Sequence, residues 1–242
     1  MEKLFDQITG QLEDKGLILK RGTVVDATII NSSNRPLSTD KREELEEEPS
    51  SQIDTEADST KKNGTWHFGY KGHIGVDVGS KLIRTLSFTG ASLHDSTQFE
   101  DLLSGDERAI FGDKAYPSKE LKQKCRKEGI YYGVLDKAYR NTPLSRAQQA
   151  RNNRNRRVRR YVEHPFSALK RRYGMAKAKA KTKLRNKARF ILGAICWNIE
   201  RSISWAKKNS NLTSATATWW VSCTYLRPNR PQRPDFRVKN EE

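Results

Sequence analysis

The chain has 242 residues, of which 35% are apolar and 31% are charged, and its formal net charge is +17. It contains no run of about eighteen apolar residues, so no membrane-spanning helix is predicted. Its N-terminus lacks the basic and apolar segments of a secretory signal. Three widely spaced cysteines form no CxxC pair, which argues against zinc and disulfides and predicts a cytoplasmic protein.

The charge is divided unevenly along the chain. Residues 1–113 carry 13 basic and 21 acidic side chains, a net charge of −8, whereas residues 114–242 carry 33 basic and 8 acidic side chains, a net charge of +25. A chain with one strongly basic half is suited to a polyanion, most commonly nucleic acid. A solvated basic tail and a membrane-surface patch are the alternatives that charge alone leaves open.

In chain order, a short helix is followed by strands and then mainly by helices. Alternating and β-branched residues predict strands over residues 17–30, 66–78, 81–90, 108–116 and 130–135. Periodicity and capping residues predict helices over residues 3–16, 94–103 and 118–129, from Thr142-Pro143 onward, and over residues 183–208. We therefore predict an α/β fold, a mixed sheet with antiparallel opening strands and later parallel ones, flanked by helices.

The segments between these elements carry their own signals. Gly79-Ser80 predicts a two-residue hairpin between the second and third strands. Residues 31–64 carry nine acids between Asp40 and Asp58 and few apolar residues, which predicts an acidic loop insertion with little packing that tolerates proteolytic nicking. Residues 209–242 show no sustained period and are predicted to be an irregular tail.

Three acids are candidates for metal chemistry. Asp26 lies in an apolar strand, where an isolated acid is costly unless it is paired, hydrogen-bonded or metal-bound. Asp113 lies at the end of another strand, where loops over a sheet gather functional groups. Glu163 is the single acid among seven Arg and Lys in residues 156–172. For each acid, a helix cap, a turn or an ion pair is the structural alternative.

The helical positions around Glu163 favour a role beside phosphate. On a helical projection, Arg156, Arg159, Glu163 and Lys170 share a stripe about 60° wide, and Pro165 predicts a kink or a new helical segment. Carboxylates on two strands and a helix suit Mg²⁺, and a pair of such ions can activate an attacking oxygen at phosphorus. A solvated face with an i,i+4 ion pair from Glu163 to Arg159 is the alternative.

Four motifs carry a resemblance to a known family: GTVVDATII, WHFGYKGHIGVD, FGDKAY and VEHPFSALKRRYG. Together and in this order they resemble the DDE transposases of bacterial insertion sequences, of the insertion-sequence-5 type. The resemblance covers residues 17–205 and implies a ribonuclease H-like catalytic domain, which we place at residues 17–208. It implies that Asp26, Asp113 and Glu163 are the catalytic triad and bind two Mg²⁺ ions, or Mn²⁺ in their place.

The same resemblance implies contacts with DNA. The related Tyr–Arg–Glu–Lys signature makes Arg159 and Lys170 DNA-backbone contacts, whereas its tyrosine position is Arg156 here. The predicted DNA-binding residues are Arg156, Arg159, Arg160, Lys170, Arg171 and Arg172. The implied partners are double-stranded DNA, as transposon ends and target, and a second copy of the chain in a homodimer on that DNA. No membrane partner is expected, and the protein is expected to associate with the nucleoid.

The implied activity is metal-dependent phosphodiester cleavage and strand transfer at insertion-sequence ends. Relatives of this type carry a longer helical N-terminal segment, so residues 1–16 are predicted to be its remnant and the chain a truncated or split reading frame. A ribonuclease H-like nuclease without strand transfer and an inactive DNA-binding remnant stay open as alternatives.

Overall fold

The computed structural model describes residues 1–48, 50, 53–62 and 64–208, and the predicted tail at 209–242 lies outside this part. The strands are β1 (Thr23–Ser32), β2 (Asp58–Lys62), β3 (Thr65–Asp77), β4 (Ile83–Gly90), β5 (Ala109–Phe111), β6 (Tyr131–Tyr132) and β7 (Lys177–Ala178). The α-helices are α1 (Glu2–Asp14), α2 (Thr39–Glu47), α3 (Lys119–Glu128), α4 (Arg146–Arg159), α5 (Glu163–Arg171) and α6 (Lys183–Lys208). Three 3₁₀ turns complete the order: η1 (Asp95–Gln98), η2 (Glu100–Leu102) and η3 (Arg160–Val162).

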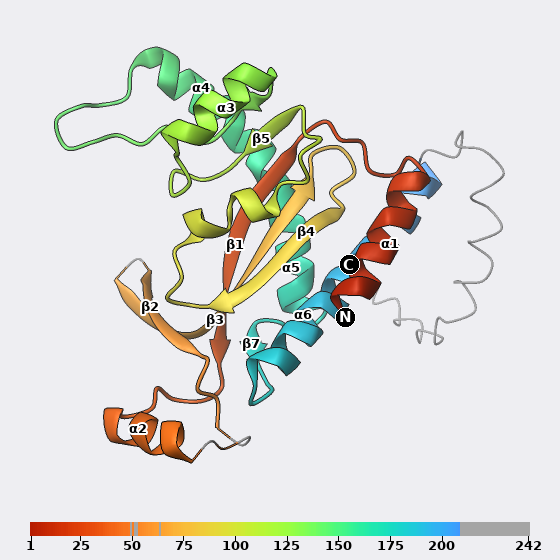
Figure 1. Cartoon of the computed structure of the whole chain (residues 1–242). Coiled ribbons are helices and arrows are strands. Elements are labelled where there is room, and N and C mark those ends of the chain that lie inside the picture. The colour runs from red at the N-terminus through yellow and green to blue at the C-terminus, as the bar shows by residue number, and fades with distance from the viewer. Residues whose placement is uncertain (49, 51–52, 63, 209–242) are drawn as a thin grey trace, which may run out of the picture.

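The strands form one mixed sheet. β4, β3 and β1 pair antiparallel, and β5 and then β6 extend the sheet in parallel with β1 (Figure 1). These directions confirm the predicted fold class, a mixed sheet with antiparallel opening strands followed by parallel ones. Two short strands extend the sheet: β2 pairs with the first half of β3, and β7 pairs with the end of β1.

Helices cover both faces of the sheet. On one face α1, α5 and α6 pack against the strands through a core that includes Val24, Ile74, Leu169 and Phe190, all fully buried (Figure 1). On the other face α3 and the turns η1 and η2 enclose a second cluster around Val25. Because successive residues of a strand point to opposite faces of the sheet, Val24 packs in the first core and Val25 packs in the second. No helix in the described part of the chain is long and apolar enough to cross a membrane.

The acidic segment 31–64 is more ordered than the sequence predicts. Ser38 caps α2 by accepting a hydrogen bond from the Lys41 amide, and β2 forms backbone pairs with β3. The prediction of a loop was therefore wrong for these two elements. Glu, Lys and Leu favour a helix by intrinsic propensity even without an apolar face, and a polar strand at a sheet edge shows no apolar alternation.

Three local predictions also differ from the structure. Residues 94–103 form two 3₁₀ turns instead of one helix. The turn between β3 and β4 is longer than two residues because the Asp77 carboxylate accepts hydrogen bonds from the Gly79 and Ser80 amides and organises it. The helix predicted from Thr142-Pro143 begins later, where Ser145 and Gln148 form a capping box at the start of α4.

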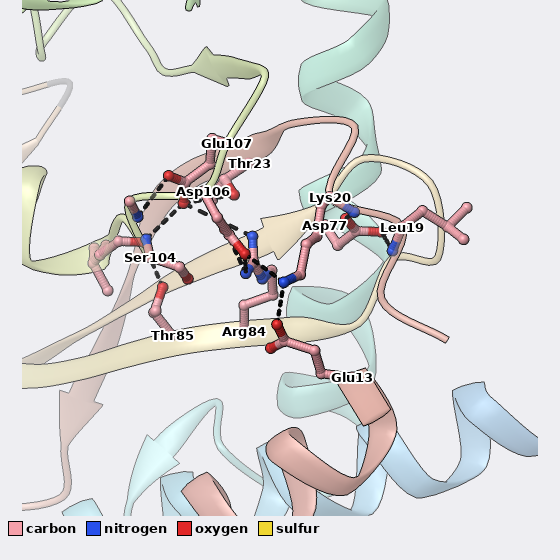
Figure 2. A network of polar contacts seen from close by, with 12 residues as sticks. Glu13, Leu19, Lys20, Thr23, Asp77, Arg84, Thr85, Ser104, Asp106 and Glu107 are labelled. Carbon is pink, nitrogen blue, oxygen red and sulfur yellow. Dashed lines mark hydrogen bonds and ion pairs between the residues drawn. The ribbon is translucent and has the colours of Figure 1, made fainter. Parts of the chain in front are cut away.

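A network of charged side chains holds the end of the sheet where β1 begins (Figure 2). Arg84 of β4 is buried and donates to Asp106 at 2.7 Å, and its second nitrogen lies 3.9 Å from the buried Glu107 carboxylate. Glu107 accepts hydrogen bonds from the Thr23 hydroxyl and the Ser104 amide. This network fixes β1 against β4 and the loop before β5, and so fixes the strand that carries Asp26.

Candidate active site

The parallel pairing of β1 and β5 brings two of the three candidate acids together. Val24 of β1 pairs with Phe111 of β5. Two residues further along each chain come Asp26 and Asp113, so the same step of two residues places both acids at the same level. The register of β1 and β5 therefore places the motif FGDKAY next to the motif GTVVDATII.

Arg159, at the end of α4, bridges the two aspartates. Its Nη2 donates to Asp26 Oδ2 at 3.0 Å, and its Nη1 donates to Asp113 Oδ1 at 3.4 Å. The side chains are partly shielded from solvent, with exposed fractions of 18% for Arg159, 26% for Asp26 and 39% for Asp113. The bridge joins residues 133 and 46 positions apart in the chain, so the fold builds this cluster from distant segments.

The surroundings oppose ionisation of Asp26. Burial raises the pKa of the Asp26 carboxyl above its usual value, the positive charge of Arg159 acts against this rise, and the negative charge of Asp113 adds to it. Burial also raises the pKa of the Tyr116 hydroxyl, and the negative charge of Asp26 adds to that rise. Tyr116 is therefore a neutral donor that lies within the electrostatic reach of the acids.

Glu163, the third candidate acid, lies apart from this bridge. It is the first residue of α5, is exposed, and makes no hydrogen bond or ion pair with Asp26 or Asp113 within the described residues. The 3₁₀ turn η3 separates it from Arg159, so the two residues do not belong to one regular α-helix. Pro165 lies in the first turn of α5, where a missing amide leaves no helical hydrogen bond unmade, and this confirms the predicted start of a new segment.

The predicted DNA-binding residues fall into two groups. Arg156, Arg160 and Arg171 are exposed, and Arg172 is exposed and forms an ion pair with Glu200 of α6. Arg159 and Lys170 are partly buried. The sequence thus indicated a basic surface on α4 and α5, but it did not indicate that Arg159 turns toward the acids.

The two aspartates fit a divalent metal ion in part. Both direct carboxylate oxygens at one positive group, the Arg159 guanidinium, and hard oxygen ligands of this kind suit Mg²⁺. Across the described ranges, no group of three or more His, Cys, Asp or Glu gathers as a metal site. Asp26 and Asp113 are therefore the residues that could hold an ion, and Glu163 could join them only from its exposed position on α5.

Two further residues near the site were not singled out from the sequence. Tyr116 ends the motif FGDKAY, and its hydroxyl is buried without a hydrogen-bond partner within the described chain. Lys62 of β2 lies close enough for its charge to act on the carboxyl of Asp26. The signal for Tyr116 was its place three residues after Asp113, whereas Lys62 lay in the segment interpreted as a loop.

Comparison with known proteins gives two findings. The chain matches the family described as the transposase DDE domain over residues 18–199, most of its length. Among solved structures, the catalytic core domain of BIV integrase is similar at 13% sequence identity, with a TM-score of 0.28 over 62% of this chain and 84% of that one.

Proposed function

This chain belongs to the transposase DDE domain family, and on that basis we propose that it cleaves DNA at the ends of an insertion sequence and joins the freed ends to target DNA. The observation that carries the proposal is the convergence of Asp26 and Asp113 on Arg159 at the end of the strongly basic helix α4. Paired carboxylates next to a cationic surface suit chemistry at a phosphodiester, whose negative charge the cations would balance.

Each residue of the cluster has a proposed role. Asp26 and Asp113 would hold divalent metal ions, two Mg²⁺ or Mn²⁺, and Glu163 would complete the set from the first turn of α5. When bound, such ions lower the pKa of an attacking hydroxyl or water and stabilise a leaving oxygen. Arg159 would fix the positions of the two carboxylates, and Tyr116 would keep water away from the buried side of Asp26.

The cations on α4 and α5 would hold the DNA backbone. Arg156, Arg160 and Arg171 are exposed and can reach phosphates directly. We place the catalytic domain at residues 17–208. Double-stranded DNA, as ends and target, is the proposed partner, with a homodimer on DNA in the nucleoid.

The test uses purified protein and a plasmid that carries the element's ends. Wild-type protein with Mg²⁺ is expected to nick at those ends, and a second assay with pre-cleaved ends is expected to show joining to target DNA. Joining separates a transposase from a ribonuclease H-like nuclease, which would nick without joining. DNA binding with neither reaction would identify an inactive remnant.

Glu163→Gln tests the third acid in the same assay. The change keeps the shape of the side chain and removes its charge, so we expect nicking to be nearly abolished while DNA binding persists. Glu128→Gln, at an exposed position on α3, is the matched control and should nick at the wild-type rate. Wild-type nicking by Glu163→Gln would remove Glu163 from the site and leave the two aspartates as its acids.

A further inference from the structure

A hollow of about 230 Å³ lies directly beside the candidate active site. Ala27, the residue after Asp26, forms part of its wall together with the next two residues of β1, and residues of β2, β3 and the start of η1 supply the rest. Three lysines line it, Lys61, Lys62 and Lys71, against one acid, Asp95. None of the DNA-binding residues predicted from the sequence takes part, so the hollow is a separate feature of the surface.

The hollow has an excess of positive charge. Lys71 already pairs with Asp95 at 2.9 Å, so these two charges cancel. Lys61 and Lys62 are exposed, and neither forms an ion pair within the residues that the structure describes. Two uncompensated ammonium groups at one recess favour an anion.

A bend in β3 brings these lysines to Asp26. Lys62 pairs with Thr65, and Ala27 pairs with His73, eight residues further along the same strand. A straight strand would separate these two pairs by about 26 Å, yet Lys62 and Ala27 line one hollow. Gly69, between the two pairs, has a φ of +148°, and an added Cβ would lie 2.3 Å from the Ile30 carbonyl oxygen. The backbone at this glycine therefore permits the tip of the β2–β3 hairpin to reach the middle of β1.

Electrostatics and an exposed ring support the same placement. Burial lowers the pKa of the Lys170 ammonium and the charge of Lys62 lowers it further, which places a cation of β2 near a cation of α5. Trp66 is 69% exposed, and Lys61 Nζ lies 5.7 Å from the centre of its ring. An exposed aromatic ring next to unpaired lysines is typical of surfaces that bind nucleic-acid strands.

We propose that this hollow is a second DNA-backbone site, in which Lys61 and Lys62 bind phosphates of the strand that enters the Asp26–Asp113 site. The inference rests on the proposed function, because DNA is the anion it assigns. The strand would then run between two sets of cations, the β2–β3 hairpin on one side of Asp26 and α5 on the other. The hairpin would hold the DNA independently of the chemistry at the carboxylates.

The test is the salt dependence of DNA binding, measured on duplex DNA without divalent metal so that no cleavage occurs. Each phosphate contact contributes about −0.9 to the slope of log affinity against log salt. Lys61→Ala/Lys62→Ala should therefore reduce the steepness of that slope by about two. Lys61→Arg/Lys62→Arg keeps both charges and should keep the wild-type slope. Lys119→Ala/Lys122→Ala removes two exposed charges from α3 and should change the slope little.

The outcomes separate this inference from the proposed function. An unchanged slope in Lys61→Ala/Lys62→Ala, in a wild-type protein that binds and nicks DNA, overturns the hairpin site and leaves the transposase proposal standing. A reduced slope in a protein that never nicks supports the hairpin site and contradicts the proposed chemistry. If the alanine variant melts below the wild-type temperature, Lys61→Gln/Lys62→Gln, which keeps the length of the side chains, replaces it with the same expected slope.

Discussion

Arg159 donates to Asp26 and to Asp113 at once, with its Nη2 3.0 Å from Asp26 Oδ2 and its Nη1 3.4 Å from Asp113 Oδ1. The two acids lie on neighbouring parallel strands, and the cation between them comes from the end of α4. Without that cation, two partly buried carboxylates would face each other.

Replacement of Arg159 by leucine should therefore destabilise the fold. The change removes the charge and keeps most of the bulk, and we expect a loss of about 1–2 kcal/mol in the free energy of unfolding at pH 7, less than for a fully buried pair because these side chains are partly exposed. The loss should shrink at an acidic pH below the raised pKa of Asp26, because the protonated carboxyl no longer forms an ion pair with the arginine. Urea unfolding at both pH values measures it. Arg156→Leu, exposed on the same helix, should change little, and an equal loss in both variants would contradict the bridge.

Asp26→Asn should stabilise the protein at neutral pH. Burial raises the pKa of Asp26 in the folded state, so the folded protein binds the proton more tightly than the unfolded chain does. The stabilisation from this proton is complete below the unfolded-state pKa and is lost as the pH rises through the folded-state pKa. At pH 7 the wild-type protein has lost it, so the asparagine variant should melt at a higher temperature. At pH 3 the difference should vanish, and a variant that melts lower at pH 7 than wild type would contradict this.

Secondary structure could be predicted from the sequence wherever a helix or strand buries one of its faces, because the spacing of apolar residues then follows the period of that element. The helix predicted over residues 183–208 matches α6, because the spacing of its apolar residues reports one buried stripe. Ser118 and Gly129 cap α3 as predicted, with the Gly129 φ at +70°. The strand directions, antiparallel first and parallel later, followed from the order of strands and helices, because parallel strands need long connections.

The site was less predictable because it depends on register and on a break in a helix. A regular helical projection places Arg159 and Glu163 on one stripe, whereas η3 interrupts the helix and only Arg159 reaches the aspartates. Lys62 approaches Asp26 because the backbone of β3 changes direction at Gly69. No local sequence pattern predicts the proximity of two residues that are this far apart in the chain. The strand β2 was not predicted within the acidic segment because the residues of β2 are polar and show no apolar alternation.

Tyr70→Phe should loosen the segment that the sequence predicted to be a loop. The Tyr70 hydroxyl donates to the buried carboxylate of Asp54 at 2.5 Å, and the second oxygen of that carboxylate is buried without a partner within the described residues. Loss of the hydroxyl removes a hydrogen bond to a charged acceptor, which costs about 1.5–3 kcal/mol, and within the described residues it leaves the Glu56 amide as the remaining donor to this carboxylate. Cleavage by protease between residues 48 and 58 should accelerate in this variant. Tyr139→Phe, at an exposed position, is the control, and equal cleavage in both would show that Asp54 does not fix the segment.

Arg84 and Lys20 offer a matched comparison in the charged network of Figure 2, because both form ion pairs with Asp106. Arg84 is 3% exposed and Lys20 is 39% exposed. Arg84→Met leaves the buried Glu107 without its nearby cation, so we expect a loss of about 3 kcal/mol in the free energy of unfolding. Lys20→Met should change the free energy little, since solvent screens an exposed pair. Equal losses in a urea titration would mean that burial does not decide the strength of these pairs.

The rate of Mg²⁺-dependent nicking by Asp113→Asn, on a plasmid with the element's ends, tests most directly whether Asp26 and Asp113 form the catalytic centre. Asp113 is more exposed than Asp26, so asparagine should fold without strain and remove one carboxylate from the cluster. The matched control is Asp101→Asn, an exposed acid of η2. We expect Asp113→Asn to bind DNA as wild type does but to lose nearly all nicking, while Asp101→Asn keeps both. Nicking by Asp113→Asn at the wild-type rate would contradict the assignment of the Asp26–Asp113 pair as the catalytic centre.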